Sequence, residues 1–274
     1  MACPSKRKAC GGDPEGDEEQ GGAGRGRRQL GRARTSSPMT PLPLAAVLAE
    51  ALERPPSWRK ISADGLDVDY CRLLGRAAAD RTLADLELHV DYFTGELAKV
   101  FVFGKWHDIP RQQCSFGDPG LSYKFSGRTV PSRPWPEPLL ALRAAVEKTA
   151  GTSFNFVLIN RYRDGADHMG EHQDAEKELD PAAPIASLSL GQPRDFVFRH
   201  REARRPRPHK KDIPSVKLTL EHGSLLLMNP PTNRVWYHSL PPRKTCPGLR
   251  VNLTFRRMLA PAPSQPVSES NVCM

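Results

Sequence analysis

The chain has 274 residues, a formal net charge of +9, 38% hydrophobic residues and 27 prolines. This length fits one large domain or two small ones, and the low hydrophobic fraction indicates that part of the chain is disordered. The positive charge favours a polyanionic partner, either nucleic acid or an acidic membrane face. Because no run of about 18 apolar residues occurs, we expect no membrane span.

Six cysteines are scattered along the chain without a CxxC pair, and the N-terminus lacks the apolar core of a signal peptide. We therefore expect a reducing environment, cytosolic or nuclear, and no disulfides.

Residues 1–55 form the first predicted segment, a disordered basic tail with little apolar surface to offset the entropy of ordering. Its clusters "PSKRK" and "GRGRRQLGRAR" can act as nuclear-localisation signals, as nucleic-acid contacts or only as a solvated linker. A helix-like stretch from Leu44 to Leu52 is either a partner-binding segment or without function. Residues 261–274 are predicted to be a second disordered tail.

The folded domain is predicted to span residues 56–260. Helical spacing occurs at 77–90 and at 137–149, where the second stretch follows prolines and stops near Gly151. Short strand-like runs fill much of the remainder. They lie at 97–104, 121–127, 154–162, 185–191, 194–200, 215–220, 223–229, 235–240 and 250–258. The pattern predicts an α+β fold, an antiparallel β-sandwich or jelly roll with helices on one flank.

A candidate metal site begins with "GEHQDAEKEL", where His172 and Asp174 lie two positions apart. In an extended segment both side chains point the same way and can reach one ion. His238, in the predicted strand "VWYHSL", is the best third ligand, although His168 competes for that role and His238 alone fits a buried structural histidine. Two histidines and one carboxylate form the facial arrangement of non-haem Fe(II) oxygenases.

The strand "RVNLTFR" alternates Arg250, Asn252, Thr254 and Arg256 with an apolar row. Two arginines on a core-facing row are costly unless anions lie there, and guanidinium groups suit a dicarboxylate such as 2-oxoglutarate. The alternative is a solvated polar face. "LINRY" adds a second polar pair, Asn160 and Tyr162.

Four segments now reveal a family resemblance: "FNFVLINRYRDGADHMGEHQD", "PIASLSLGQPRDFVFRH", "GSLLLMNPPTNRVWYHSLP" and "RVNLTFR". Over about Trp58 to Met258 the chain resembles the AlkB family of Fe(II)/2-oxoglutarate dioxygenases. The resemblance implies a double-stranded β-helix with iron held by His172, Asp174 and His238. It also implies a 2-oxoglutarate site formed by Asn160, Tyr162, Arg250, Asn252, Thr254 and Arg256.

The implied activity is oxidative demethylation of 1-methyladenine and 3-methylcytosine in DNA, with etheno adducts as further substrates. Oxygen is the second cosubstrate, and succinate, CO2 and formaldehyde are released. Such a base must leave the duplex before its methyl group reaches the iron. The resemblance places a wedge-bearing hairpin and a base pocket at eight positions: Val102, Phe103, Gly104, Arg111, Tyr123, Phe125, Ala175 and Glu176.

One of these positions departs from the family pattern. Ala175 follows Asp174 where an acidic residue that helps to recognise the base is expected, so the base preference is less well defined than the metal site. The basic run at 199–211 can hold DNA phosphates or be a solvated loop.

The expected partner is alkylated double-stranded DNA, and the expected location is the nucleus. The alternatives are the same chemistry on single-stranded DNA or RNA, or a catalytically silent nucleic-acid-binding module. Binding to the replication clamp is not supported, since the expected N-terminal motif is missing from "MACPSKRKAC". The chain is expected to be a monomer.

Overall fold

The computed structural model describes residues 42–102, 104–125 and 127–259, with Val102 and Phe125 described as backbone only. The two basic clusters, the clamp question and the tail at 261–274 therefore lie outside the described residues. The helical elements are α1 (Leu44–Ala51), α2 (Arg76–His89), α3 (Glu137–Ala150), α4 (Thr232–Val235) and the 3-10 turns η1 (Gly95–Ala98) and η2 (Arg201–Arg204).

The strands occur in runs between and after these helices. They are β1 (Arg59–Ala63), β2 (Leu66–Arg72), β3 (Lys99–Val102), β4 (Lys105–Asp108), β5 (Gln112–Gly117), β6 (Ser122–Phe125), β7 (Arg128–Pro131), β8 (Phe156–Tyr162), β9 (Met169–His172), β10 (Ile185–Gly191), β11 (Arg194–His200), β12 (Val216–Leu220), β13 (Ser224–Met228), β14 (Trp236–Leu240) and β15 (Arg250–Arg256).

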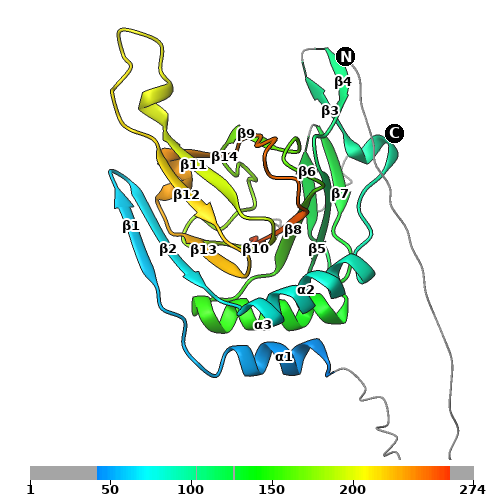
Figure 1. Cartoon of the computed structure of the whole chain (residues 1–274). Helices are drawn as coiled ribbons and strands as arrows, with labels where there is room; N and C mark the ends of the chain where they lie inside the picture. The colour runs from blue at the N-terminus through cyan, green and yellow to red at the C-terminus, as the bar shows by residue number, and fades with distance from the viewer. Residues whose placement is uncertain (1–41, 103, 126, 260–274) are drawn as a thin grey trace, which may run out of the picture. The chain divides into compact units, whose positions relative to one another are not determined.

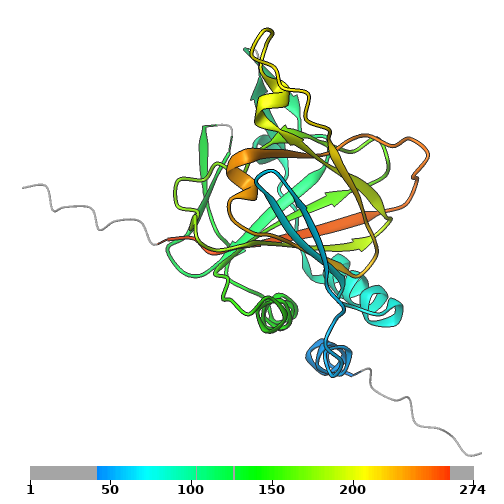
Figure 2. The same ribbon diagram turned by 90° about the vertical axis from the view of Figure 1, so that its left-hand side faces the viewer.

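Two antiparallel sheets face each other (Figures 1 and 2). The larger sheet has the strand order β1-β2-β13-β10-β15-β8-β5, and the smaller one has the order β12-β11-β14-β9. The hairpins β3–β4 and β6–β7 form two separate two-stranded sheets. This arrangement is the predicted α+β jelly roll, and the fold prediction is confirmed.

The larger sheet has two chemically different faces because side chains alternate along each strand. On β15, Val251, Leu253 and Phe255 are buried in the core that α1, α2 and α3 cover, as Figure 1 shows for α2 and α3 beneath the sheet. The other four side chains of β15 point to the opposite face, between the sheets. One strand therefore contributes to the main core and to the inter-sheet space.

Helix α3 begins and ends where the sequence predicts. Pro136 is its N-cap residue, Pro138 lies in its first turn and Gly151 closes it with a φ of +67°, a left-handed backbone that favours glycine. Leu139 and Leu142 are buried against the sheet. Helix α2 likewise matches the predicted span 77–90.

Helix α1 lies before the predicted domain boundary at residue 56, yet it belongs to the fold. Leu44 and Leu48 are buried in the main core with residues of α2 and α3. The folded part thus begins by Leu44, because two leucines four positions apart form an apolar stripe on one helix face.

A second apolar core fills the space between the sheets at the β1–β2 end. It contains Val68, Leu226, Phe198 and Trp236, and the indole Nε1 of Trp236 donates to the Asp64 carbonyl oxygen at 2.8 Å. This core holds the smaller sheet over the larger one, and the polar site occupies the neighbouring part of the inter-sheet space. Within the described residues, no helix is long and apolar enough to cross a membrane.

Candidate metal and cosubstrate site

A cavity of about 900 Å³ lies between the two sheets. Strands β8, β10 and β15 of the larger sheet form its floor, and β9, β11 and β14 of the smaller sheet form one wall. Of the predicted site residues with described side chains, all line this cavity. They are Asn160, Tyr162, His172, Asp174, His238, Arg250, Asn252, Thr254 and Arg256, together with Arg111, Tyr123, Ala175 and Glu176.

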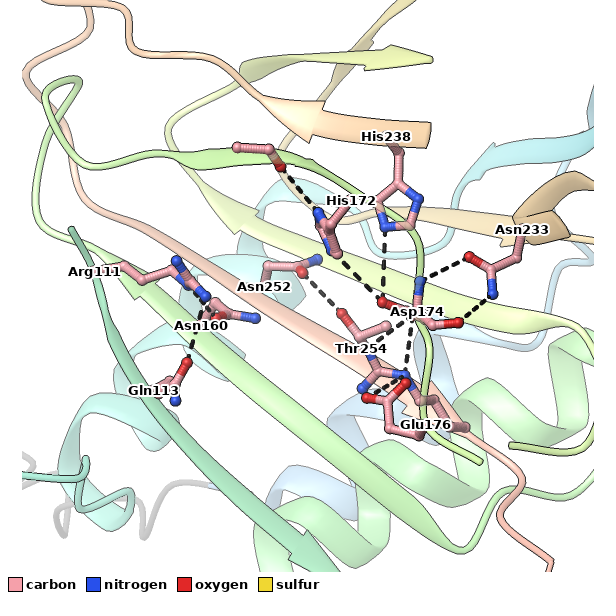
Figure 3. Close-up of polar contacts among 12 residues, drawn as sticks. Arg111, Gln113, Asn160, His172, Asp174, Glu176, Asn233, His238, Asn252 and Thr254 are labelled. Carbon is pink, nitrogen blue, oxygen red and sulfur yellow. Dashed lines mark hydrogen bonds and ion pairs between the residues drawn. The ribbon is translucent and has the colours of Figure 1, made fainter. Parts of the chain in front are cut away.

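Three potential metal ligands converge in the cavity (Figure 3). His172 ends β9 and lies directly opposite His238 on β14, and Asp174 follows β9 by two residues. The carboxylate oxygen Oδ1 of Asp174 lies 3.6 Å from His172 Nε2 and 3.8 Å from His238 Nε2. One ligand atom from each residue falls within 4.8 Å of the others, which is the spacing of donors around a single ion.

The side chain and backbone of Asp174 are both fixed. Its amide donates to Asn233 Oδ1 at 2.9 Å, and Asn233 Nδ2 donates back to the Asp174 carbonyl oxygen at 2.8 Å (Figure 3). The guanidinium of Arg256 donates to Oδ2 through Nη2 at 2.8 Å and through Nε at 3.1 Å. Arg256 thus occupies one carboxylate oxygen and leaves the other facing the two imidazoles, the kind of orientation that supports metal ligation.

The protonation states suit a metal centre. Burial, followed by the nearby imidazole of His172, lowers the pKa of His238 to about 3, so the His238 imidazole is neutral at physiological pH. Burial alone would raise the pKa of Asp174, but Arg256 and the two histidines outweigh it and the pKa falls below its usual range. A neutral imidazole and an ionised carboxylate are the forms that bind metal.

The tautomer of His172 follows from its backbone contact. Its Nδ1 lies 3.0 Å from the carbonyl oxygen of Gly170, so this nitrogen carries the proton and donates it. The lone pair is then on Nε2, the atom that faces Asp174 and His238.

Arg250 supplies a buried cation without a carboxylate. It is 2% exposed, its Nη2 donates to Ser189 Oγ at 3.0 Å, and its guanidinium carbon lies 5.2 Å from the centre of the Tyr162 ring. Its Nε has no hydrogen-bond partner, and the described residues give Arg250 no ion pair. Burial lowers the pKa of Arg250 to about 10, which leaves it charged. A fully buried guanidinium of this kind fits the carboxylate of a bound molecule.

The two arginines of β15 therefore differ. Arg256 is paired with Asp174, and only its Nη1 remains buried without a partner. That Nη1 can still donate to a second carboxylate oxygen. The cavity thus presents unpartnered guanidinium donors from both Arg250 and Arg256, a chemistry that suits a dicarboxylate.

Asn252 and Thr254 act within the sheet. Asn252 Nδ2 donates to Ser187 Oγ at 2.8 Å and to the Leu188 carbonyl oxygen at 3.0 Å, and its Oδ1 accepts from Thr254 Oγ1 at 3.0 Å. Both side chains line the cavity, but the amide hydrogens of Asn252 are used by β10. On β8, Asn160 Oδ1 accepts from Arg111 Nε at 2.8 Å (Figure 3), which turns its amide nitrogen away from Arg111.

The predicted base pocket is partly described. Tyr123 on β6 is buried beside Phe156, with ring centres 6.0 Å apart, and burial raises its pKa to about 12. Glu176 Oε2 is buried without a partner, and its Oε1 lies 4.0 Å from Arg256 Nε. Gly104 adopts a φ of +77°, as the predicted tight turn requires. Phe103 lies outside the described residues, and Val102 and Phe125 are placed only as backbone in β3 and β6.

Several residues at the site were missed by sequence reasoning. Asn233 holds the Asp174 loop, and Ser187 and Ser189 support Asn252 and Arg250. The serines had a signal, since they alternate with apolar residues in "IASLSLG". Asn233 had none, because its contact depends on how α4 meets the β9–β10 loop.

The fold and the site define a class of protein. Residues 102–256 match the model of the 2OG-Fe(II) oxygenase superfamily. The chain is 55% identical over 204 residues to mouse DNA oxidative demethylase ALKBH2, covering 74% of this chain and 85% of the relative. The human ALKBH2 protein is 56% identical over the same length, with 74% and 78% covered. Rat alkB homolog 3 is 36% identical over 152 residues, with 54% and 50% covered.

The chain belongs to the AlkB family of 2OG-Fe(II) oxygenases. Its cofactor is Fe(II), and 2-oxoglutarate is its cosubstrate, as the sequence predicts. The residues present fit both groups, since the His-Asp-His donor set is ready to bind a divalent ion and Arg250 is a buried cation that lacks a carboxylate.

Proposed function

We propose that this chain is a nuclear DNA oxidative demethylase that removes N-alkyl groups from bases of double-stranded DNA. The observation that carries the proposal is the juxtaposition of the His172–Asp174–His238 cluster with the unpaired guanidinium of Arg250 in one cavity. The names of the mouse and human relatives, DNA oxidative demethylase, support DNA as the substrate.

His172, Asp174 and His238 would hold Fe(II), and Arg250 and Arg256 would hold the carboxylates of 2-oxoglutarate. When bound, the iron and cosubstrate supply an O2-dependent oxidation in which 2-oxoglutarate becomes succinate and CO2 and the N-methyl carbon gains one oxygen atom. The hydroxymethyl group then leaves nitrogen as formaldehyde, and the base is restored. Asp174 remains ionised through this cycle because Arg256 stabilises its charge.

The cavity walls suit a base that has left the duplex. Tyr123 contributes a buried aromatic wall. The buried Glu176 Oε2 has no hydrogen-bond partner, and an exocyclic amino group of the base can donate to it. 1-Methyladenine and 3-methylcytosine both present aromatic faces and hydrogen-bonding edges to such a pocket. Ala175, a small residue exposed on the same loop, also lines the cavity, and the proposal extends to bulkier etheno adducts.

Two segments project from the sheets in Figure 1, the hairpin β3–β4 and the loop that follows β11. Phe101 and Trp106 pair across the hairpin and are 50% and 45% exposed, which suits stacking against nucleic acid. Within the proposal, Phe103 fills the gap left by the flipped base. The loop carries basic residues suited to DNA phosphates. They are Arg201, Arg204, Arg205, Arg207, Lys210 and Lys211, with Arg199 near the end of β11.

The test is release of formaldehyde and succinate, with Fe(II), 2-oxoglutarate and O2, on matched oligonucleotides that carry 1-methyladenine in single-stranded and duplex form. We expect one formaldehyde for each repaired base and turnover on the duplex. Turnover confined to single-stranded DNA or RNA would replace the duplex proposal with that alternative. An absence of turnover on every substrate would leave the silent binding module.

The metal assignment has its own control. Asp174→Ala is expected to abolish both formaldehyde release and metal binding, because it removes a ligand. Asp180 lies in the loop between β9 and β10, and its carboxylate pairs with Arg257. The control variant Asp180→Ala is expected to retain both formaldehyde release and metal binding. Full activity of Asp174→Ala would refute the metal site.

A further inference from the structure

A bridge between the two hairpins beside the cavity has no place in the chemistry described above. Arg128 is the first residue of β7, at the turn of the hairpin β6–β7. Its Nη1 donates to the Glu96 carbonyl oxygen at 2.8 Å, and its Nη2 donates to Glu96 Oε2 at 2.9 Å. Its guanidinium carbon also lies 4.3 Å from the centre of the Trp106 ring. The Arg128 side chain thus contacts the neighbouring hairpin β3–β4 at two points, at Glu96 before β3 and at Trp106 on β4.

The hairpin β3–β4 is separate from the two main sheets. Strands β3 and β4 pair only with each other in the described sheet topology, and all four residues of β4 are exposed. Trp106 packs against Phe101 on one side, with ring centres 5.1 Å apart, and contacts the Arg128 guanidinium as well. Such a two-stranded unit is weakly ordered by itself, so contacts to the body set its angle.

The partner hairpin carries the pocket. Tyr123 lies on β6, two residues before the pairing of Phe125 with Arg128, and it is buried in the cavity wall. Val100 on β3 lines the same cavity. Arg128 therefore connects the hairpin whose aromatic pair faces solvent with the hairpin that forms the base pocket.

The ion pair is charged under ordinary conditions. The hydrogen bond from Arg128, followed by the charge of Lys99, holds the pKa of Glu96 below its usual value. The arginine also combines two contacts that lysine cannot make together, a forked donation to Glu96 and a cation–π contact with Trp106.

We propose that Arg128 is a positioning residue that fixes the β3–β4 hairpin against the base pocket and so determines the preference for duplex over single-stranded substrate. The inference rests on the proposed function. A base in single strand reaches the pocket without help from a wedge, whereas a duplex base is extracted only when the hairpin is held at the right place. Arg128 touches no reacting group, so its loss affects the choice of substrate and leaves the chemistry intact.

The experiment compares kcat/KM on duplex and single-stranded 1-methyladenine oligonucleotides. Arg128→Ala is expected to lower the duplex to single-strand ratio by about three- to tenfold, the scale of one exposed ion pair and one cation–π contact. The single-strand value is expected to fall by less than about twofold, and Arg128→Lys is expected to restore part of the ratio.

Two further variants distinguish the loss of the Arg128–Glu96 contact from a change in net charge. Glu96→Gln changes the net charge in the opposite direction but removes the ion pairs of Glu96 with Arg128 and Lys99, and it is expected to lower the ratio as well. Arg133→Ala removes an arginine whose described side-chain contacts are with Phe93, 5.0 Å from its ring centre, and with the Asp91 carbonyl oxygen, not with β3 or β4, and it is expected to leave the ratio unchanged.

Hydrogen exchange gives a readout that does not require turnover. Amides of residues 99–102 and 104–108 are expected to exchange faster in Arg128→Ala and Glu96→Gln, and at the wild-type rate in Arg133→Ala. Unchanged exchange in both bridge variants would overturn the inference, as would equal losses on duplex and single-stranded substrates. Absence of turnover by the wild-type protein would instead count against the proposed function, and the exchange result would still decide the bridge.

Discussion

At the scale of single residues, the alternation in "RVNLTFR" predicted that two arginines share a polar face and need anions. The structure supplies one anion from the protein itself, since Asp174 pairs with Arg256. The sequence could not reveal this pair, because 82 positions separate the two residues and only the strand order brings them together. The His-x-Asp spacing, in contrast, is local and therefore predictable.

Arg250 gives the first residue-scale prediction. Arg250→Met replaces a buried, unpaired cation with an apolar side chain of similar length. We expect the dissociation constant for 2-oxoglutarate to rise about 10- to 100-fold, since a charge-assisted hydrogen bond contributes about 1.5–3 kcal/mol. Without cosubstrate, the melting temperature is expected to stay or rise, because the buried charge no longer lacks a carboxylate.

Titration calorimetry with 2-oxoglutarate and a thermal melt measure these two effects. Arg201→Met, on the exposed loop after β11, is the control and is expected to bind 2-oxoglutarate as the wild type does. Tight binding by Arg250→Met would show that the carboxylate is held elsewhere.

At the scale of elements, regular apolar patterns predicted the strands well. β10 and β11 occupy 185–191 and 194–200, the ranges expected from the sequence. Six strands were not predicted, namely β1, β2, β4, β5, β7 and β9. Two of them lack an apolar pattern, since β1 is a polar edge strand and β4 is exposed at all four residues. Their pairing is set by hairpin geometry and by neighbouring strands, so composition alone does not identify them.

Helix α1 provides the element-scale prediction. Leu48 is 2% exposed and packs in the core with α2 and α3, so Leu48→Ala is expected to lower the free energy of unfolding by about 2–4 kcal/mol. Leu42→Ala is the matched control, because Leu42 is 58% exposed, and it is expected to have almost no effect. Urea unfolding of the full chain measures both, and equal stabilities would show that α1 does not contribute to the fold.

At the scale of the whole molecule, part of the net charge of +9 is concentrated in the basic segment at 199–211. Arg199 and Arg204 share the carboxylate of Glu171. Among the described residues, Arg201, Arg205, Arg207 and Lys210 form no ion pair. These four are therefore the cations of this loop most available to DNA phosphates.

Salt dependence tests this assignment. Replacing Arg201, Arg205 and Arg207 with glutamine is expected to reduce the log–log slope of duplex affinity against salt by about 0.9 for each phosphate that the variant no longer neutralises. Fluorescence anisotropy between about 50 and 200 mM salt measures the slope. A control that neutralises three exposed residues near the helices, Arg54, Arg76 and Lys148, is expected to keep it. Equal slopes in both variants would place the DNA elsewhere.

The central position of β15 has a consequence for how the protein is made. It is the last strand of the described fold, yet it lies between β10 and β8. Until residues 250–256 leave the ribosome, the larger sheet consists of two separate parts, β1-β2-β13-β10 and β8-β5. The same seven residues bring Arg250 and Arg256. A nascent chain therefore lacks both the closed sheet and its cosubstrate-binding cations until almost the whole domain has been synthesised.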